Sequence, residues 1–350
     1  MDTRIIAIDE KNIDNNLMRE AGDIIKAGGL VAFPTETVYG LGGDALNPTS
    51  SVKIYSAKGR PSDNPLIVHI AKWEDIARIT VNLPDNAKKL ADRFWPGPLT
   101  MVLNKSLDVP YETTGGLDTV AVRMPVNKTA LAFIEASGGY VAAPSANVSG
   151  RPSPTNAKYV IEDMNGRIDM IIDGGDSGIG LESTIVDLTG DIPMILRPGY
   201  ITLDMLKEVV GEVALDPTLL DLDSSERPKA PGMKYRHYAP KGNLMIVKGS
   251  VDDVCEHINI HISEALGLGI KVGIIATDET ADRYAGGSIK SVGSRTDEDL
   301  IAHRLYTILR EFDDEDVALI YSESFDEGGL GQAIMNRLLK AAGHQVIELN

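Results

Sequence analysis

Residues 14–33 read D-N-N-L-M-R-E-A-G-D-I-I-K-A-G-G-L-V-A-F and contain the pattern on which the fold prediction rests. Spaced apolar positions with charged residues opposite them indicate a helix over 14–27, and the apolar run L-V-A-F (30–33) indicates a buried strand after it. The same alternation predicts further helices at 84–94 and 155–164, and further strands at 66–70, 99–103, 119–124, 170–173 and 184–188. Interleaved strands and helices favour an α/β fold. Several connections are too short for a helical crossover, so the sheet should be mixed.

The stretch 211–242 contains four prolines and no sustained period, which is typical of a linker. Beyond it, strands are expected at 244–247, 271–276, 317–321 and 345–349, with helices near 251–266, 297–311 and 332–342. That order predicts a small three-layer domain with a parallel sheet. The predicted organisation is a first domain over 1–210, a linker over 211–242 and a second domain over 243–350.

The composition argues against several classes of protein. The 350 residues are enough for about two domains. The one cysteine, Cys255, rules out an internal disulfide and zinc sites built on cysteine pairs. Lys and Arg number 34 against 51 Asp and Glu, and the net charge of −17 argues against a protein that coats nucleic acid by bulk positive charge. No apolar run has the length of a signal-peptide core or a membrane helix, so we expect a cytoplasmic protein with no membrane partner.

The common catalytic and nucleotide-binding motifs are absent from the sequence. Neither G-x-x-x-x-G-K-[ST] nor G-x-G-x-x-G occurs, so a nucleotide would have to bind in another geometry. There is also no H-E-x-x-H and no G-x-S-x-G. His257 and His261 have helical spacing but lack a third metal ligand, and a solvated helix face explains them best.

Hydroxyl and amide side chains gather in loops at the ends of apolar strands. In F-P-T-E-T-V-Y-G-L-G (33–42), Thr35 and Thr37 can donate hydrogen bonds to a ligand, although a hairpin turn with a capping threonine explains the same residues. His69 ends an apolar strand and is by itself more typical of a core residue. Loops 142–155 and 180–187 offer further groups that either cap helices or bind a polar ligand, namely Ser145, Asn147, Ser149, Ser153, Ser183 and Thr184.

Isolated cations lie in the same kind of position. Lys58 and Arg60 are two residues apart, and residues i and i+2 of an extended loop point the same way, so they should converge on one anion unless they are solvated surface charges. Arg123 lies within an apolar strand, so it must either bind a carboxylate or phosphate in a pocket or form a buried ion pair with Asp118 or another acid. Together with Arg197, these cations on an acidic background fit a site for a polyanionic small molecule.

Eight ordered segments resemble the YrdC-type threonylcarbamoyl-adenylate synthases in their longer, two-domain form. They are F-P-T-E-T-V-Y-G-L-G (33–42), K-G-R-P-S-D-N-P-L-I-V-H (58–69), W-P-G-P-L-T (95–100), G-L-D-T-V-A-V-R-M-P (116–125), A-A-P-S-A-N-V-S-G-R-P-S-P-T (142–155), E-S-T-I-V-D (182–187), L-R-P-G (196–199) and A-P-G-M-K-Y-R-H-Y-A-P (230–240). The resemblance is strong over about residues 5–240, and the acidic C-terminal domain fits the same form. It implies a twisted α/β sheet with a concave face, followed by a small Rossmann-like domain, and a linker that lies over the active site.

The resemblance also implies a reaction, in which L-threonine, bicarbonate or CO2, and ATP give threonylcarbamoyl-adenylate and pyrophosphate. Mg²⁺ would be held mainly by the ATP phosphates, and the product would pass to a separate transferase that modifies tRNA; direct binding of tRNA is left open. The residues implied to bind the nucleotide are Lys58, Arg60, Ser62, Thr119, Ser145, Asn147, Ser153, Arg197 and Tyr235, of which Lys58 and Arg60 are also the implied catalytic residues. Those implied to surround threonine are Thr35, His69, Arg123 and Ser183.

Two other functions fit part of the pattern. A concave basic face would bind double-stranded RNA or tRNA without catalysis, which predicts salt-sensitive RNA affinity and no ATP turnover; the charge of −17 argues against it. A related carbamoyl-transfer domain would use carbamoyl phosphate. Such domains lie in larger chains with zinc-finger parts, and cysteine pairs are absent from this sequence.

Overall fold

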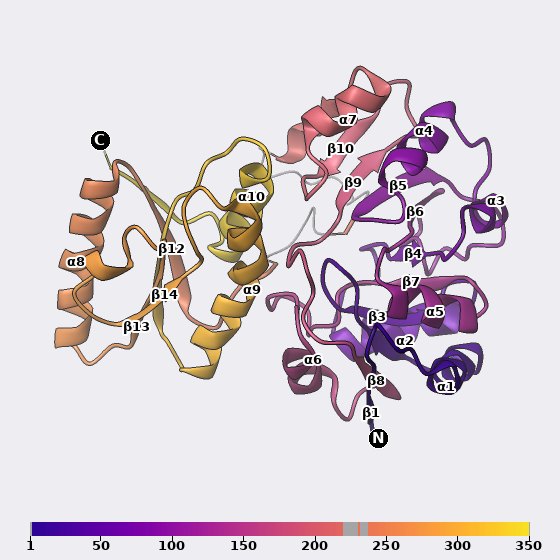
Figure 1. Ribbon diagram of the computed structural model, residues 1–350, viewed down its shortest axis with the longest axis horizontal. Helices are drawn as coiled ribbons and strands as arrows, with labels where there is room; N and C mark the ends of the chain where they lie inside the picture. Colours follow the sequence, from indigo (N-terminus) through magenta and orange to yellow (C-terminus); the bar gives the residue numbers. More distant parts are fainter. Residues whose placement is uncertain (1, 220–229, 232–236, 350) are drawn as a thin grey trace. The chain divides into compact units, whose positions relative to one another are not determined.

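The computed structural model describes residues 2–219, 230–231 and 237–349 (Figure 1). By their contacts these residues form two compact units. The first comprises the described residues of 2–149, 154–178 and 182–231, and the second those of 150–153, 179–181 and 237–349. Two short segments from within the first predicted domain are therefore counted with the second unit.

The first unit is built on one large sheet, which has 11 strands among the described residues. In order across the sheet they are β1 (Arg4–Ala7), β8 (Met170–Asp173), β2 (Val31–Phe33), β3 (Gly40–Asp44), β7 (Val141–Ala143), β4 (Ile67–His69), β6 (Thr119–Arg123), β5 (Leu99–Asn104), β9 (Thr184–Asp187), β10 (Met194–Arg197) and β11 (Ala214–Leu215). β6 is parallel to β4 on one side and antiparallel to β5 on the other. The predicted mixed sheet is thus confirmed.

Capping side chains begin most helices of this unit. Asp14 caps α1, Asn47 caps α2 with Pro48 in its first turn, and Thr202 caps α7. The helices are α1 (Asn15–Lys26), α2 (Pro48–Lys58), α3 (Ile76–Ile79), α4 (Asp85–Phe94), α5 (Lys128–Ala136), α6 (Ala157–Met164) and α7 (Leu203–Val210). The predicted helices are confirmed as α1, α4 and α6. Helix α2 was not predicted, because its apolar residues do not form one stripe.

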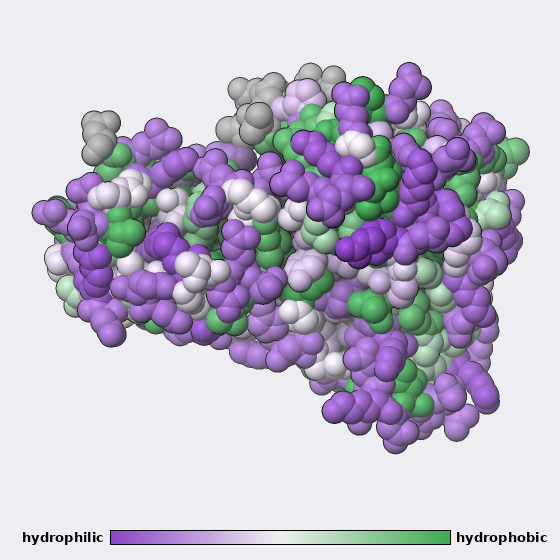
Figure 2. Space-filling model, turned by 45° about the horizontal axis from the view of Figure 1, so that its top comes forward, coloured by the Kyte–Doolittle hydropathy of each residue, from purple (hydrophilic) through white to green (hydrophobic). Residues whose placement is uncertain are grey.

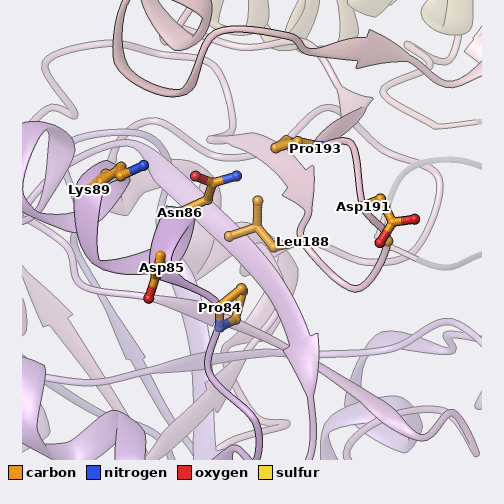
Figure 3. A pocket seen from close by; sticks show the side chains of 8 residues that line it. Pro84, Asp85, Asn86, Lys89, Leu188, Asp191 and Pro193 are labelled. Atoms are coloured by element: carbon orange, nitrogen blue, oxygen red, sulfur yellow. The ribbon is translucent and has the colours of Figure 1, made fainter.

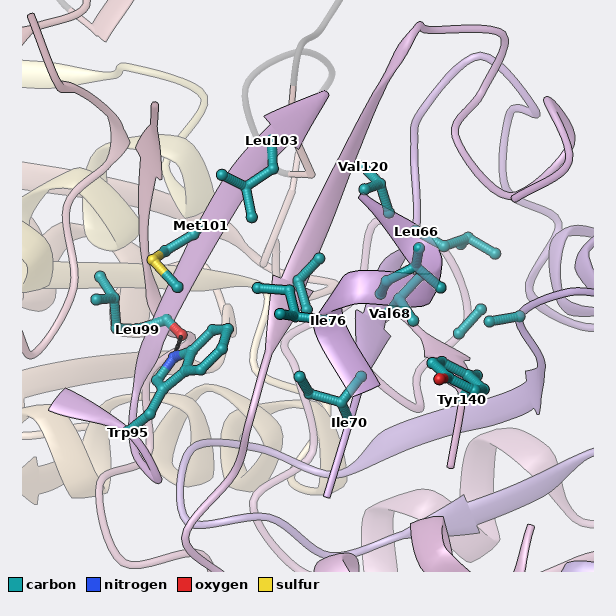
Figure 4. Packing of buried hydrophobic residues seen from close by; sticks show 14 of the residues in the cluster. Leu66, Val68, Ile70, Ile76, Trp95, Leu99, Met101, Leu103, Val120 and Tyr140 are labelled. Carbon is teal, nitrogen blue, oxygen red and sulfur yellow. Dashed lines mark hydrogen bonds between the residues drawn. The ribbon is translucent and has the colours of Figure 1, made fainter. Parts of the chain in front are cut away.

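Alternation along the central strands separates a core face from a polar face. Val120 of β6 is buried in a cluster with apolar side chains of β4 and β5 (Figure 4). Trp95 lies in the same cluster, and its indole N–H donates a hydrogen bond of 2.7 Å to the Leu99 carbonyl. Successive residues of a strand point to opposite faces, so Ala121 and Arg123 lie on the other face of β6. This second face carries the polar side chains on which the candidate site is built.

The second unit is a parallel sheet with five described strands, in the order β14 (Ser288–Ser291), β13 (Val272–Ala276), β15 (Leu319–Glu323), β12 (Asn243–Lys248) and β16 (Val346–Glu348). Helix α8 (Val251–Gly267) lies on one face, and α9 (Glu298–Asp314) and α10 (Gly331–Ala341) lie on the other (Figure 1). The predicted three-layer, parallel domain is thus confirmed. β14 was not predicted, since its sequence S-I-K-S offers a single apolar residue.

Part of the stretch predicted to be a linker is regular. β11 pairs in parallel with β10, and a short 3-10 helix follows at Pro217–Leu219. No strand was predicted at these residues, because a two-residue edge strand leaves no periodic signal in the sequence. Further along, Ala230 is fully buried in a cluster with side chains of the polar face of the sheet, among them Ile67 and Ala121.

Hydrophilic side chains cover most of the face shown in Figure 2, as expected of a chain in which 24% of the residues are charged. Large apolar side chains are exposed at scattered positions such as Leu107 and Leu268. In the part of the chain that the structure describes, every helix is too short or too polar to cross a membrane.

Candidate active site

A row of polar side chains crosses one edge of the sheet in the first unit, and we call it the polar row. In the strand register, His69 at the end of β4 lies beside Arg123 at the end of β6, which in turn lies beside Thr100 on β5. The Thr100 hydroxyl is 2.7 Å from the hydroxyl of Ser183, which directly precedes β9. Ser183 Oγ accepts a hydrogen bond of 3.2 Å from Arg197 Nη2 at the end of β10. Strand order therefore brings together four of the predicted residues and adds Thr100.

Arg123 is the buried cation of this row, with 4% of its surface exposed. Its Nη2 forms an ion pair of 2.6 Å with Glu36, and its Nη1 donates to Thr37 Oγ1 at 2.8 Å. Asp118, the partner that the sequence suggested by name, accepts a hydrogen bond from Tyr111 instead. The sequence left two alternatives open for Arg123, a ligand contact or a buried ion pair. The structure shows the buried ion pair, and its partner is Glu36.

His69 is buried beside Arg123. Its Nδ1 is 3.1 Å from the Ile67 carbonyl and donates to it, and its ring meets the edge of Phe33 at 5.9 Å between centroids. Burial, followed by the charge of Arg123, lowers the pKa of His69 to about 3. The imidazole is therefore neutral at physiological pH. Because Nδ1 carries the one N–H, the other ring nitrogen, Nε2, can accept a hydrogen bond without adding charge to the polar row.

Thr35 organises the loop that carries Glu36 and Thr37. Its hydroxyl donates to the Val38 carbonyl at 2.6 Å and lies 2.9 Å from Thr37 Oγ1. The amides of Thr37 and Val38 in turn point at Thr35 Oγ1, at 3.2 and 3.3 Å. This arrangement is a turn with a capping threonine, which is one of the two explanations that the sequence allowed for these residues. It aims the Thr37 hydroxyl at Arg123.

Lys58 anchors the neighbouring loop of Ser145 and Asn147. Its Nζ donates to the carbonyl oxygens of Ser145 and Asn147 at 2.5 and 2.6 Å and lies 3.3 Å from Asn147 Oδ1. The expectation that Lys58 and Arg60 share an extended loop was wrong. Lys58 is the last residue of α2, and Gly59 ends the helix with φ 62°, a left-handed conformation that glycine adopts without strain.

Arg60 folds back on its own loop, with Nη2 donating to the carbonyls of Asn64 and Pro65 at 3.3 and 3.1 Å. Ser62 is exposed. Thr119 begins β6 on the same face as Arg123 and is half-buried. The hydrogen bonds described for Arg60 thus run to its own loop, whereas those described for Lys58 run to the loop of Ser145 and Asn147.

The segment 35–40 contacts both the polar row and the loop of Ser145 and Asn147 that Lys58 anchors. The Ala146 amide donates to the Tyr39 carbonyl at 2.8 Å, and Gly40 forms an isolated antiparallel bridge with Ser145. A Cβ atom at Gly40 would lie 2.9 Å from the Phe33 ring, so glycine permits this close approach. The two groups of predicted residues thus lie at one side of the first unit.

The remaining two predicted nucleotide-binding residues are Ser153 and Tyr235. Ser153 is buried in the segment 150–153, which is counted with the second unit. Tyr235 lies outside the described residues.

A pocket of about 340 Å³ opens elsewhere in the first unit, between the start of α4 and the turn from β9 to β10 (Figure 3). Asp85, Lys89 and Asp191 are among the residues that line it. None of the predicted site residues does so. Because it is lined by none of these residues, the pocket is not part of the candidate site.

Two known protein families match consecutive parts of the chain. The family described as "Telomere recombination" (Sua5, YciO and YrdC) matches residues 23–199, and the family described as "Threonylcarbamoyl-AMP synthase, C-terminal domain" matches residues 201–343. The chain belongs to the Sua5 and YrdC family. The resemblance drawn from the eight sequence segments is thereby confirmed.

Relatives within this family match nearly the whole chain. The threonylcarbamoyl-AMP synthase of Pyrococcus abyssi is 47% identical over 99% of this chain and 100% of its own, and that of Bacillus subtilis is 47% identical over 97% of this chain and 96% of its own. The crystal structure of P. abyssi Sua5 complexed with L-threonine superposes with a TM-score of 0.94, covering 99% of this chain and 100% of that chain.

Sequence reasoning missed Thr100, a member of the polar row, and Glu36, the ion-pair partner of Arg123. Thr100 ends the segment W-P-G-P-L-T but was assigned no role, and Glu36 is the sole acid within 33–42. The signal for Glu36 was available in principle: a buried arginine requires a counter-charge. Only the folded structure shows that the acid comes from a segment 87 residues away.

Proposed function

We propose that this protein joins L-threonine, CO2 derived from bicarbonate, and ATP to give threonylcarbamoyl-adenylate and pyrophosphate. The observation that carries the proposal is the polar row, in which a buried arginine, a neutral histidine and two hydroxyls converge in a chain that matches synthases over its full length. The product would serve a separate transferase that modifies tRNA.

Threonine would bind along the polar row. The Arg123 guanidinium suits the α-carboxylate, since it is buried and held in place by Thr37 and Glu36. Neutral His69 and the Ser183 hydroxyl suit the polar groups of the substrate, and Thr35 holds the loop that shapes this end. The amine adds to CO2 and gives a carbamate, whose oxygen attacks the α-phosphorus in line while pyrophosphate departs. No covalent enzyme intermediate is needed.

The nucleotide would bind beside threonine, at Lys58 and the loop of Ser145 and Asn147. Carbamate and triphosphate are both anions, so cations must offset their repulsion, and Lys58, Arg60 and Arg197 supply that charge. The remaining members of the proposed nucleotide site are Ser62, Thr119, Ser145, Asn147, Ser153 and Tyr235. In the described part of the chain no three His, Cys, Asp or Glu side chains gather as metal ligands. Mg²⁺ would enter with ATP on its phosphates, where it would supply charge neutralisation.

We further propose that the linker 211–242 covers the site and excludes water. Pro231 supports this, because its carbonyl accepts a hydrogen bond of 3.2 Å from Arg197 Nη1, while Arg197 Nε donates to the Ser183 carbonyl at 3.1 Å. Arg197 thus ties the linker to the polar row. A covered site protects the carbamate and the adenylate from hydrolysis.

Replacing Arg197 with methionine should therefore lower the rate of product formation by roughly 10- to 100-fold, the loss expected for one or two hydrogen bonds of a charged group. It should also raise the yield of AMP per pyrophosphate released, since the adenylate is exposed to water. Chromatographic quantification of AMP and of the adenylate measures both effects. Arg93→Met on the exposed surface of α4 is the control. An Arg197→Met enzyme with the wild-type rate and the wild-type AMP yield would contradict the role of the linker.

The reaction itself is tested by pyrophosphate release from ATP and bicarbonate, with and without L-threonine. We expect release that depends on L-threonine and a product with the mass of threonylcarbamoyl-adenylate. A protein that binds RNA in a salt-sensitive manner but does not turn over ATP would overturn the proposal in favour of the RNA-binding alternative. Turnover that requires carbamoyl phosphate would overturn it in favour of carbamoyl transfer.

A further inference from the structure

Glu36 is the acidic partner of Arg123 in the polar row, and the roles proposed above use it only to hold the guanidinium in place. Its Oε1 pairs with Arg123 Nη2 at 2.6 Å, and its Oε2 accepts a hydrogen bond of 3.3 Å from the Val126 amide. The side chains of Glu36 and Arg123 are 11% and 5% exposed. A buried ion pair contributes little net stability, because desolvation offsets the attraction. Its place at the predicted threonine site therefore suggests a role in ligand recognition.

While it is paired with Glu36, the Arg123 guanidinium still has N–H groups that a ligand could accept from. A guanidinium has five N–H groups. Three of those of Arg123 donate to Gly97, Thr37 and Glu36. One N–H on each terminal nitrogen makes no hydrogen bond within the described residues. A substrate carboxylate can therefore bind Arg123 without displacing Glu36.

The charges of this end of the row sum to zero. Arg123 and Glu36 cancel, His69 is neutral, and Thr37 and Thr100 carry no charge. A neutral, poorly solvated site accepts a ligand of zero net charge more readily than an ion, because an unpaired charge loses its hydration without compensation. A free carboxylic acid anion would meet the Arg123 guanidinium but also the nearby Glu36 carboxylate. An α-amino acid brings its own ammonium group to that carboxylate.

On the basis of the proposed function, we propose that Glu36 and Arg123 together recognise the zwitterion of an α-amino acid. Arg123 binds the α-carboxylate, and Glu36 accepts a hydrogen bond from the α-ammonium group while it fixes the guanidinium. Glu36 is thus a specificity-determining residue, which distinguishes amino acids from hydroxy acids of the same shape. After binding, the ammonium proton passes to bicarbonate, which becomes CO2 and water; the neutral amine then adds to that CO2, and the carbamate forms with loss of a second proton to solvent.

The test compares two ligands that differ by one group, L-threonine and β-hydroxybutyrate, which is threonine without its amino group. Calorimetric binding of both is measured for the wild type, for Glu36→Gln and for Glu20→Gln. Glu20 also pairs with an arginine, Arg4, but on the surface. We expect the wild type to prefer L-threonine strongly. Glu36→Gln should weaken threonine binding by about 10- to 100-fold, the worth of one hydrogen bond to a charged group. It should bind the hydroxy acid as well as or better than the wild type does. Glu20→Gln should match the wild type.

Kinetics give a second readout. In Glu36→Gln the KM for L-threonine should rise, whereas the KM for ATP should stay within about threefold of the wild type, which a general loss of structure would not produce. If Glu36→Gln does not fold, Glu36→Asp takes its place; it keeps the charge and should keep the preference for threonine. An unchanged preference in Glu36→Gln, or a lost preference in Glu36→Asp, overturns the inference. A wild-type protein that does not bind L-threonine overturns the proposed function itself, so the two failures are distinguishable.

Discussion

Replacing Lys58 with methionine is expected to lower kcat/KM for ATP by roughly 100-fold or more, since hydrogen bonds from a buried charged group are worth about 1.5–3 kcal/mol each. Lys58 is 1% exposed, and its Nζ is bonded to oxygens of both Ser145 and Asn147. Methionine fills a similar volume without these bonds. The loop of Ser145 and Asn147 then loses its anchor, and the nucleotide loses a cation. Initial rates of pyrophosphate release over a range of ATP concentrations measure the effect.

Lys53→Met is the matched control, because Lys53 lies on the same helix and also donates to a backbone carbonyl, that of Gly28 at 2.6 Å, but is exposed. It should retain nearly full activity. Circular dichroism at the assay temperature shows whether the Lys58 variant is folded. A folded Lys58→Met enzyme with ATP kinetics within about threefold of the wild type would show that Lys58 is dispensable for the nucleotide site.

The sequence predicted the second unit more completely than the first. Three of the four predicted strands of the second unit are apolar runs, such as K-V-G-I-I-A at 271–276, and amphipathic helices lie between them in the sequence. In the first unit, β3 is G-L-G-G-D, with three glycines, and β7 has three residues. Such strands are stabilised by their neighbours in the sheet and not by their own propensity. Their place in the sheet therefore could not be predicted.

The candidate site shows the same division between local and long-range information. The residue types at the site were readable, because a buried arginine or a lysine beside two prolines needs an explanation in any fold. Their mutual arrangement was not, because Lys58 proved to end a helix and to contact a loop 87 and 89 residues further on. The pairing of Arg123 with Glu36 depends in the same way on the strand order, which single-sequence patterns do not encode.

A buried polar cluster closes the carboxyl-terminal edge of the sheet in the second unit. The connection from β13 runs to β14 at one side, whereas the connection from β15 runs to β16 at the other, so a crevice should open between β13 and β15. Nucleotides commonly bind at such a crevice. Here Glu323, at the end of β15, lies there with 2% exposed, and its carboxylate accepts hydrogen bonds from Thr280 and from the Tyr284 hydroxyl, the latter at 2.7 Å. Arg295 forms an ion pair with it. The protein's own side chains therefore satisfy the charge of Glu323.

This arrangement predicts that Glu323→Ala destabilises the second unit by about 1–3 kcal/mol, the cost of leaving buried hydrogen-bond donors without their acceptor. Arg295, Thr280 and Tyr284 would each lose a partner; burial and the charge of Glu323 raise the pKa of Tyr284, so its hydroxyl stays protonated and would remain as a buried donor. Hydrogen exchange of the β15 amides in denaturant measures the loss. Both tryptophans, Trp73 and Trp95, lie in the first unit, so their fluorescence follows that unit separately.

The control for this prediction is Glu327→Ala, which removes an exposed carboxylate that pairs with Lys248 at 2.8 Å. Exposed ion pairs contribute at most about 1 kcal/mol, so its exchange rates should change little. Glu323→Gln should fall between the two, because the amide oxygen still accepts from Thr280 and Tyr284 while the ion pair with Arg295 is lost. If Glu323→Ala exchanges no faster than Glu327→Ala, the cluster does not hold the edge of the sheet together. The crevice between β13 and β15 would then be free to open, and a ligand site there would have to be considered in place of a structural lock.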